Sequence, residues 1–112
     1  FVRLAFLKHF AVPGADEEQG VSRMLHLFQS AAFPLGMVRV SQPGAPTAHD
    51  TEVLPYDYTV YTSLMCAESL RFYWTSYENQ RVQYVDLHKL MDQPAPVQFA
   101  LDRKADFRCL TP

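Results

Sequence analysis

The side chains best suited to chemistry in this chain are four histidines and two cysteines, and they are widely dispersed. No histidine shares a metal-type spacing with another, and no cysteine or acid pair completes a ligand set. We therefore interpret each as a surface or partly buried polar residue, and we expect neither a metal nor a cofactor in the chain. The histidines are His9, His26, His49 and His88.

The two cysteines, Cys66 and Cys109, do not fit the pattern of a catalytic thiol. An activated thiolate usually lies at a helix N-terminus or beside a cation. Cys66 instead ends a predicted strand, and Cys109 lies in a polar tail. Two cysteines are also too few for a disulfide scaffold. We expect two free thiols, with Cys66 buried and Cys109 exposed.

Three further candidates have simpler structural explanations. Ser63 lacks the Gly-x-Ser-x-Gly context of a nucleophile elbow. The adjacent acids Glu17 and Glu18 point in different directions on a helix, so stabilisation of its N-terminus explains them better than acid–base catalysis. The aromatic run at residues 72–74 has no basic patch around it, so core packing explains it better than base stacking. The sequence thus predicts no catalytic, cofactor-binding or metal-binding residue in this chain.

The composition is typical of a soluble globular protein. Of 112 residues, 48% are hydrophobic and 20% are charged. The net charge of -2 and the pI of about 6.0 argue against nucleic acid or an anionic membrane as a partner. No apolar run approaches the ~18 residues that a membrane span needs. The opening at Phe1 shows no signal-peptide pattern, so we expect any targeting information upstream.

The first third of the chain has the pattern of two helices. Residues 1–10 are almost wholly apolar and predict a short, deeply buried helix that a Pro-Gly pair ends. Asp16 and Gln19 occupy the N-cap and capping-box positions of a second helix, which we expect to end near Phe33. An apolar stripe at helical spacing supports it. The stripe is Val21, Met24, Leu25, Phe28 and Ala32.

A period of two begins after Tyr56 and predicts an antiparallel meander with hairpin-length connections. A further edge strand is expected at residues 97–101, because prolines just before it suit an edge. The main strands are expected at residues 57–66, 71–77 and 81–87.

This order of elements predicts the α+β class, with helices on one face of an antiparallel sheet. In the second strand, Phe72 and Trp74 point to one face and Tyr73 and Thr75 to the other, so we expect both faces to be covered. The second cover would have to come from a layer that this chain lacks. We interpret residues 1–112 as one segment of a single domain, with an internal loop at 41–55 and a C-terminal tail at 102–112.

Several segments match, in order, the pattern of one known family. Residues 1–7 (FVRLAFL) resemble its helix R-F-V/I-R-x-A-F/Y-L. Residues 22–28 resemble its next helix, F-F-H-I/L-L, and residues 33–36 its x-P-K-G exit. Residues 58–66 (YTVYTSLMC) resemble its strand Y-T-x-Y-S/T-S-x-x-C.

The match continues through the second half of the chain. Residues 72–81 resemble the pattern Y-Y-Y/F-x-x-Y-E/D-N-x-x-I/V, and residues 85–87 fit the strand that follows it. Residues 102–106 resemble a tail of penicillin V acylases. The chain therefore resembles the C-terminal portion of the choloylglycine hydrolase family, bacterial cysteine amidohydrolases that include penicillin V acylases and bile salt hydrolases.

The resemblance implies an N-terminal nucleophile hydrolase with a four-layer αββα sandwich. Its nucleophile is an N-terminal Cys whose own α-amine acts as the base. That Cys, and an Arg that precedes the residue matching Phe1, fall outside this chain. Arg3 matches a different family position, and an ion pair or hydrogen bonds at the helix surface explain it. The implied partner is therefore the N-terminal part of the same enzyme, which carries the nucleophilic Cys.

The expected substrate is a linear amide: penicillin V, a conjugated bile salt or an N-acyl homoserine lactone. We expect a homo-oligomer in the bacterial cytoplasm or periplasm, without nucleic acid or membrane partners. The alternative is a non-catalytic interaction domain that presents its aromatic sheet face to a partner, or a pseudo-enzyme without the nucleophile. In either case we expect the isolated chain to be inactive and poorly soluble.

Overall fold

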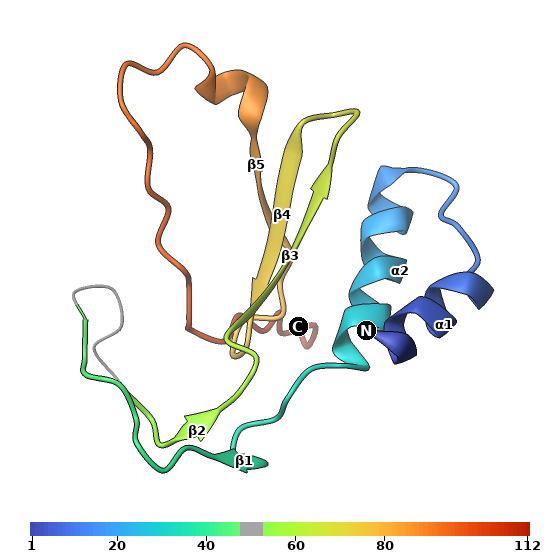
Figure 1. The fold of residues 1–112 in the computed structure, drawn as a ribbon. Helices are drawn as coiled ribbons and strands as arrows, with labels where there is room; N and C mark the ends of the chain where they lie inside the picture. The colour runs from blue at the N-terminus through green and yellow to red at the C-terminus, as the bar shows by residue number, and fades with distance from the viewer. Residues whose placement is uncertain (48–52) are drawn as a thin grey trace.

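Two helices are followed by a small two-stranded ribbon and a three-stranded antiparallel sheet (Figure 1). The computed structural model describes residues 1–47 and 53–112. The α+β class predicted from the order of elements is confirmed. The elements are α1 (Val2–Phe10), α2 (Glu17–Gln29), β1 (Val38–Arg39), β2 (Tyr56–Asp57), β3 (Tyr61–Cys66), β4 (Arg71–Ser76), β5 (Gln83–Asp86) and the 3-10 helix η1 (Leu87–Leu90).

Helix α1 lies where the sequence predicts a helix, but it is not buried. Leu4 and Leu7 are half-buried, on the side of the helix that we assign to its contact with α2. On another side, Val2, Phe6 and Phe10 are 80%, 63% and 66% exposed. The expectation of a deeply buried helix is therefore wrong within this chain, because nothing in its described residues covers this second apolar stripe.

Helix α2 begins as predicted and ends earlier. The Asp16 side chain caps it by accepting a hydrogen bond from the Gln19 backbone N–H at 2.8 Å. Leu25, in the predicted stripe, is buried. The helix ends at Gln29 rather than near Phe33, because Ser30 donates its hydroxyl to the carbonyl of Leu27 at 2.6 Å and supplies a local C-terminal cap.

The chain reverses after α2 in a tight turn and then forms the ribbon. The N–H of Met37 donates to the carbonyl of Pro34 at 3.2 Å, and Gly36 has φ +95°, as the third position of a type II turn requires. β1 pairs antiparallel with β2. The strand predicted at residues 57–66 is thus divided into β2 and β3. His49 lies outside the described residues.

The main sheet is the antiparallel meander β3-β4-β5. Ser63 pairs with Trp74, and Trp74 pairs with Gln83. The strands predicted at residues 71–77 and 81–87 are confirmed with slightly shorter bounds. Alternation in β4 also follows the prediction: Tyr73 and Thr75 are buried on the side of α2, and Trp74 lies on the opposite face.

The edge strand predicted at residues 97–101 is not formed. After β5 the chain enters η1 and returns along an irregular path that Pro94 and Pro96 interrupt (Figure 1). The segment still approaches the sheet through its side chains, because the ring of Phe99 lies 6.5 Å from that of Trp74. Its alternating pattern reflects this one-sided contact and not strand pairing.

The described chain does not build a full core. Its accessible surface is 9241 Å², whereas a compact protein of this mass exposes roughly 6,300 Å². Its radius of gyration is 16.7 Å, against about 13 Å for a compact chain of similar length. Within residues 1–47 and 53–112, the buried apolar side chains are those of Leu25 and Tyr73, which are 7% and 5% exposed. None of the helices described is both long and apolar enough to cross a bilayer.

Candidate functional site

The face of the main sheet that points away from α2 is only partly covered, and we call it the open face. The strand register assigns to it the side chains of Tyr61, Ser63 and Met65 from β3, of Phe72, Trp74 and Ser76 from β4, and of Gln83 and Val85 from β5. Tyr61 and Met65 are 57% and 63% exposed. Ser63 pairs with Trp74 and lies between Tyr61 and Met65 on this face.

An apolar trough of about 300 Å³ runs along the open face. The rings of Phe72 and Trp74 lie 6.2 Å apart on its floor, and residues 99–101 form one wall. Neither a charged side chain nor a nucleophile lines it. The trough can therefore bury apolar groups, and the hydroxyl of Tyr61 is the one titratable group among its lining residues.

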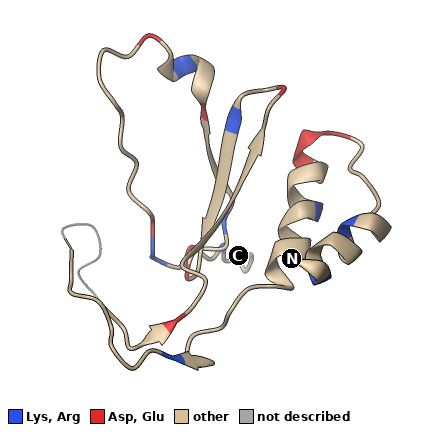
Figure 2. Cartoon of the chain, in the orientation of Figure 1, with Lys and Arg blue, Asp and Glu red and all other residues tan. Residues whose placement is uncertain are grey.

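A polar cluster on the opposite face ties α2 to the sheet. The carboxylate of Glu17 accepts hydrogen bonds from the hydroxyl of Tyr73 and, at 2.7 Å, from that of Ser69. Arg71 lies 4.0 Å from the same carboxylate and stacks over the ring of Tyr84. Figure 2 shows in red the acidic start of α2 and in blue a basic position at the start of β4.

The cluster shifts the titration of its members in directions that follow from these contacts. The hydrogen bonds from Tyr73 and then Ser69 lower the pKa of Glu17. Burial, and then the bond to Glu17, raise the pKa of Tyr73. Glu18 is exposed and takes no part in these bonds. The structure thus does not bring Glu17 and Glu18 together as an acid pair.

The two cysteines lie in different surroundings. Cys66 is half-buried, so the expectation that it is buried is wrong; its position beside the β3–β4 turn leaves it partly open, and its thiol donates to Glu68 at 3.3 Å. Cys109 is exposed, as expected, and hydrogen bonds with Thr111 lower its pKa. Both are free thiols.

A buried network that the sequence did not single out fastens the C-terminal tail. Asn79, only 2% exposed, donates from Nδ2 to Oδ2 of Asp102 at 3.1 Å. Its Oδ1 accepts from the N–H of Arg81 at 3.0 Å, and Ser76 donates its hydroxyl to the Asp102 carbonyl at 2.5 Å. Arg81 also pairs with Asp106 at 2.6 Å. In the sequence, the indication of this network was Asn79, which belongs to the family pattern matched at residues 72–81.

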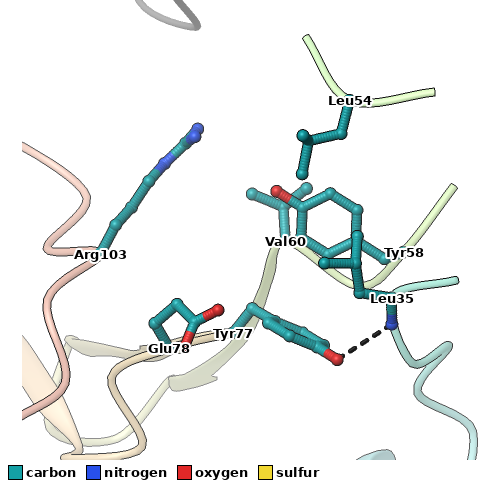
Figure 3. A pocket seen from close by; sticks show the side chains of 7 residues that line it. All are labelled: Leu35, Leu54, Tyr58, Val60, Tyr77, Glu78 and Arg103. Carbon is teal, nitrogen blue, oxygen red and sulfur yellow. Dashed lines mark hydrogen bonds between the residues drawn. The ribbon is translucent and has the colours of Figure 1, made fainter. Parts of the chain in front are cut away.

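A small hollow lies between the turn after α2 and the start of the sheet (Figure 3). Its volume is about 160 Å³, below the roughly 300 Å³ at which small-molecule sites begin. Leu35 donates its N–H to the hydroxyl of Tyr77 at 2.9 Å, the dashed line in the figure. The ring of Tyr58 meets that of Tyr77 edge-on at 5.2 Å. We interpret this hollow as a packing gap.

The remaining candidates do not converge. His9 contacts the ring of Phe10, and His26 and His88 are exposed. Across residues 1–47 and 53–112, no three His, Cys, Asp or Glu side chains group to hold a metal ion. Arg3 is exposed on α1. The described residues therefore present the open face and two structural networks, and the absence of catalytic residues from this chain stays a prediction.

Comparison with known families gives a match over most of the chain. A sequence model of the linear amide C-N hydrolases, choloylglycine hydrolase family, matches residues 1–99. A bile salt hydrolase/transferase of Clostridium perfringens is 26% identical over 89 residues, which cover 80% of this chain and 24% of that protein. One from Lactiplantibacillus plantarum is 25% identical over 108 residues, or 96% of this chain and 30% of that protein.

Solved structures share the fold. Two variants of the conjugated bile acid hydrolase from Clostridium perfringens superpose with TM-scores of 0.69 and 0.70, at 19% and 20% identity. Each match covers 98% of this chain and 30% of the other. The chain thus spans less than a third of the length of the proteins that it matches.

Proposed function

Because the chain belongs to the choloylglycine hydrolase family of linear amide C-N hydrolases, we propose that it is the C-terminal structural part of a longer cysteine N-terminal nucleophile amidohydrolase. In this proposal the nucleophilic Cys lies in the remaining part of the polypeptide, and the Cys α-amine takes the thiol proton. The bond cleaved is the C–N bond of a linear amide such as penicillin V, a conjugated bile salt or an N-acyl homoserine lactone.

The observation that carries this proposal is the open face. An antiparallel sheet can leave one face to water when that face is polar, but here the face carries Phe72, Trp74 and Val85 around an apolar trough. Such a surface requires a covering layer. A second sheet from the rest of the polypeptide would supply it and complete an αββα sandwich, with α1 and α2 in one outer layer.

The role proposed for this chain within the enzyme is to position other groups. α1 would hold the chain immediately upstream, where the family has an Arg beside its nucleophile, by rigid attachment. The Glu17 cluster fixes α2 to the hairpin of β3 and β4. Substrate specificity would come from loops in the remaining part of the polypeptide. This chain therefore does not distinguish among the three amide classes, and all three are assayed.

The test is hydrolysis by the full-length protein. Penicillin V, glycocholate and an N-acyl homoserine lactone are each incubated with it, and the released amine or acid is quantified. Cleavage of one of them, abolished when the N-terminal Cys is replaced by Ala, would support the proposal. A well-folded full-length protein that cleaves none of the three would reject it in favour of a pseudo-enzyme or a non-catalytic interaction domain.

A further inference from the structure

One edge of the main sheet, the outer edge of β3, is unpaired. The N–H of Tyr77 donates to the carbonyl of Val60 at 2.9 Å, so the hydrogen-bonded pairs of β3 and β4 are the even-numbered residues of β3. The backbone groups of Tyr61, Ser63 and Met65 therefore point away from β4. In the described part of the chain, no backbone or side-chain group hydrogen-bonds to them.

This edge has none of the devices that normally prevent strand pairing. Between Tyr61 and Cys66 there is no proline, no charged residue and no bulge. Native edge strands are usually protected by such features, or they are covered or paired. A six-residue strand with alternating side chains and free N–H and C=O groups is a template for a further strand.

The position of α2 indicates that the sheet continues past β3. α2 approaches β3 more closely than it approaches β4 or β5. A hollow of about 280 Å³ separates Val21 and Ser22 of α2 from Tyr73 and Tyr84 of β4 and β5. A helix is about 10 Å wide and covers roughly two strands spaced about 4.8 Å apart. A helix that contacts a sheet mainly at its edge strand therefore lacks part of its support.

We propose that the outer edge of β3 is a strand-addition site, occupied in the mature protein by a β-strand from the part of the polypeptide outside this chain. The inference rests on the proposed function in one respect, namely that this chain belongs to a longer polypeptide. In the matched structures the corresponding segment is 30% of the chain. The added strand is apolar on both faces, because one face lies beneath α2 and the other continues the open face beside Tyr61 and Met65.

Residue-resolved hydrogen exchange of the full-length protein tests this directly. The amides of Thr62, Leu64 and Cys66 bond to β4 and serve as the internal reference. The amides of Tyr61, Ser63 and Met65 are expected to be protected to within about tenfold of that reference, at every protein concentration. Exchange of these three roughly a hundredfold faster or more would show a free edge and overturn the proposal.

Dilution identifies the occupant. Protection of Tyr61, Ser63 and Met65 that disappears as the protein is diluted to monomers would assign the edge to a second copy and overturn the stated occupant. The result is independent of amide hydrolysis. A protein that cleaves no amide but protects these amides would reject the enzyme and retain the strand, and an active enzyme with a freely exchanging edge would do the reverse.

A matched pair of variants gives a second measurement. Ser63→Pro removes only an outward N–H, which a free edge tolerates; Ser63→Ala changes the side chain and keeps the N–H. With a strand added at this edge, Ser63→Pro lowers Tm by roughly 5 °C or more relative to Ser63→Ala. Equal melting temperatures for the two variants would count against the proposal.

Discussion

At the scale of single residues, the most constrained side chain is that of Asn79. Its amide serves two segments at once, because Nδ2 reaches Asp102 in the tail and Oδ1 holds the N–H of Arg81 in the turn. Removing one partner of a buried hydrogen bond leaves the other polar group without a partner and without water. The free energy lost is then larger than the net free energy that the bond contributes.

We therefore predict that Asn79→Ala destabilises the full-length protein by about 2 kcal/mol, measured by denaturant unfolding. The neighbouring Glu78→Ala is the control, since Glu78 is exposed and should change stability by less than about 0.5 kcal/mol. Combining Asn79→Ala with Asp102→Ala should cost less than the sum of the two, because the single changes each leave the other group unpaired. Strict additivity would disprove the coupling.

The Glu17 carboxylate predicts an acid-dependent loss of stability. Hydrogen bonds from Tyr73 and Ser69 hold its pKa below the ordinary 4.5. A carboxyl whose folded pKa is depressed stabilises the fold above its unfolded pKa, and this contribution is lost as pH falls through the folded pKa. Glu17→Gln should therefore lower Tm by a few degrees at neutral pH, and the difference from wild type should shrink below pH 4.5. A difference independent of pH in that range would refute this account; Glu18→Gln is the exposed control.

At the scale of elements, Gly14 in the connection between α1 and α2 and Gly20 within α2 differ in whether they can accept a side chain. A Cβ built on Gly14 would lie 2.3 Å from the backbone N of Gly20, whereas one on Gly20 meets no atom within 4 Å. Gly14→Ala should thus push the connection away from the first turn of α2 and cost about 2 kcal/mol or more. Gly20→Ala should stabilise α2 by about 0.5–1 kcal/mol, because alanine is the better helix former. Thermal unfolding of both variants checks the pair, and equal effects would contradict the contact.

These elements also mark how far sequence reasoning reaches. The Asp16 cap, the β3-β4-β5 hairpins and the alternation of β4 were predictable, because each depends on neighbours close in sequence. The ribbon of β1 and β2 was not, since it joins Val38 to Asp57 across a long loop. Residues 97–101 alternate like a strand but lie where no partner strand runs. The role of Glu17 was only half visible: its helix position is local, but its bonds to Ser69 and Tyr73 join distant segments.

At the scale of the whole molecule, the exposed apolar surface follows a consistent geometry. The open face of the sheet and the exposed stripe of Val2, Phe6 and Phe10 belong to different elements, and α2 lies between α1 and the sheet (Figure 1). A single small partner would cover one of them. Apolar surface on separate elements of the chain is instead what a segment enclosed within a larger fold exposes when it is taken alone.

We predict that the isolated 112-residue chain self-associates and unfolds without a sharp cooperative transition. Its 9241 Å² of accessible surface exceeds that of a compact protein of its mass by about 3,000 Å², and large apolar side chains such as Phe1, Phe6 and Phe107 are exposed. With so little apolar area buried, chain entropy is not offset within one copy, and association or loose packing follows. Sedimentation velocity and differential scanning calorimetry of the chain, beside the full-length protein, provide the measurement. A monodisperse monomer with a single sharp unfolding transition would show that these layers stand alone, and the open face would then have to be explained as an interaction surface.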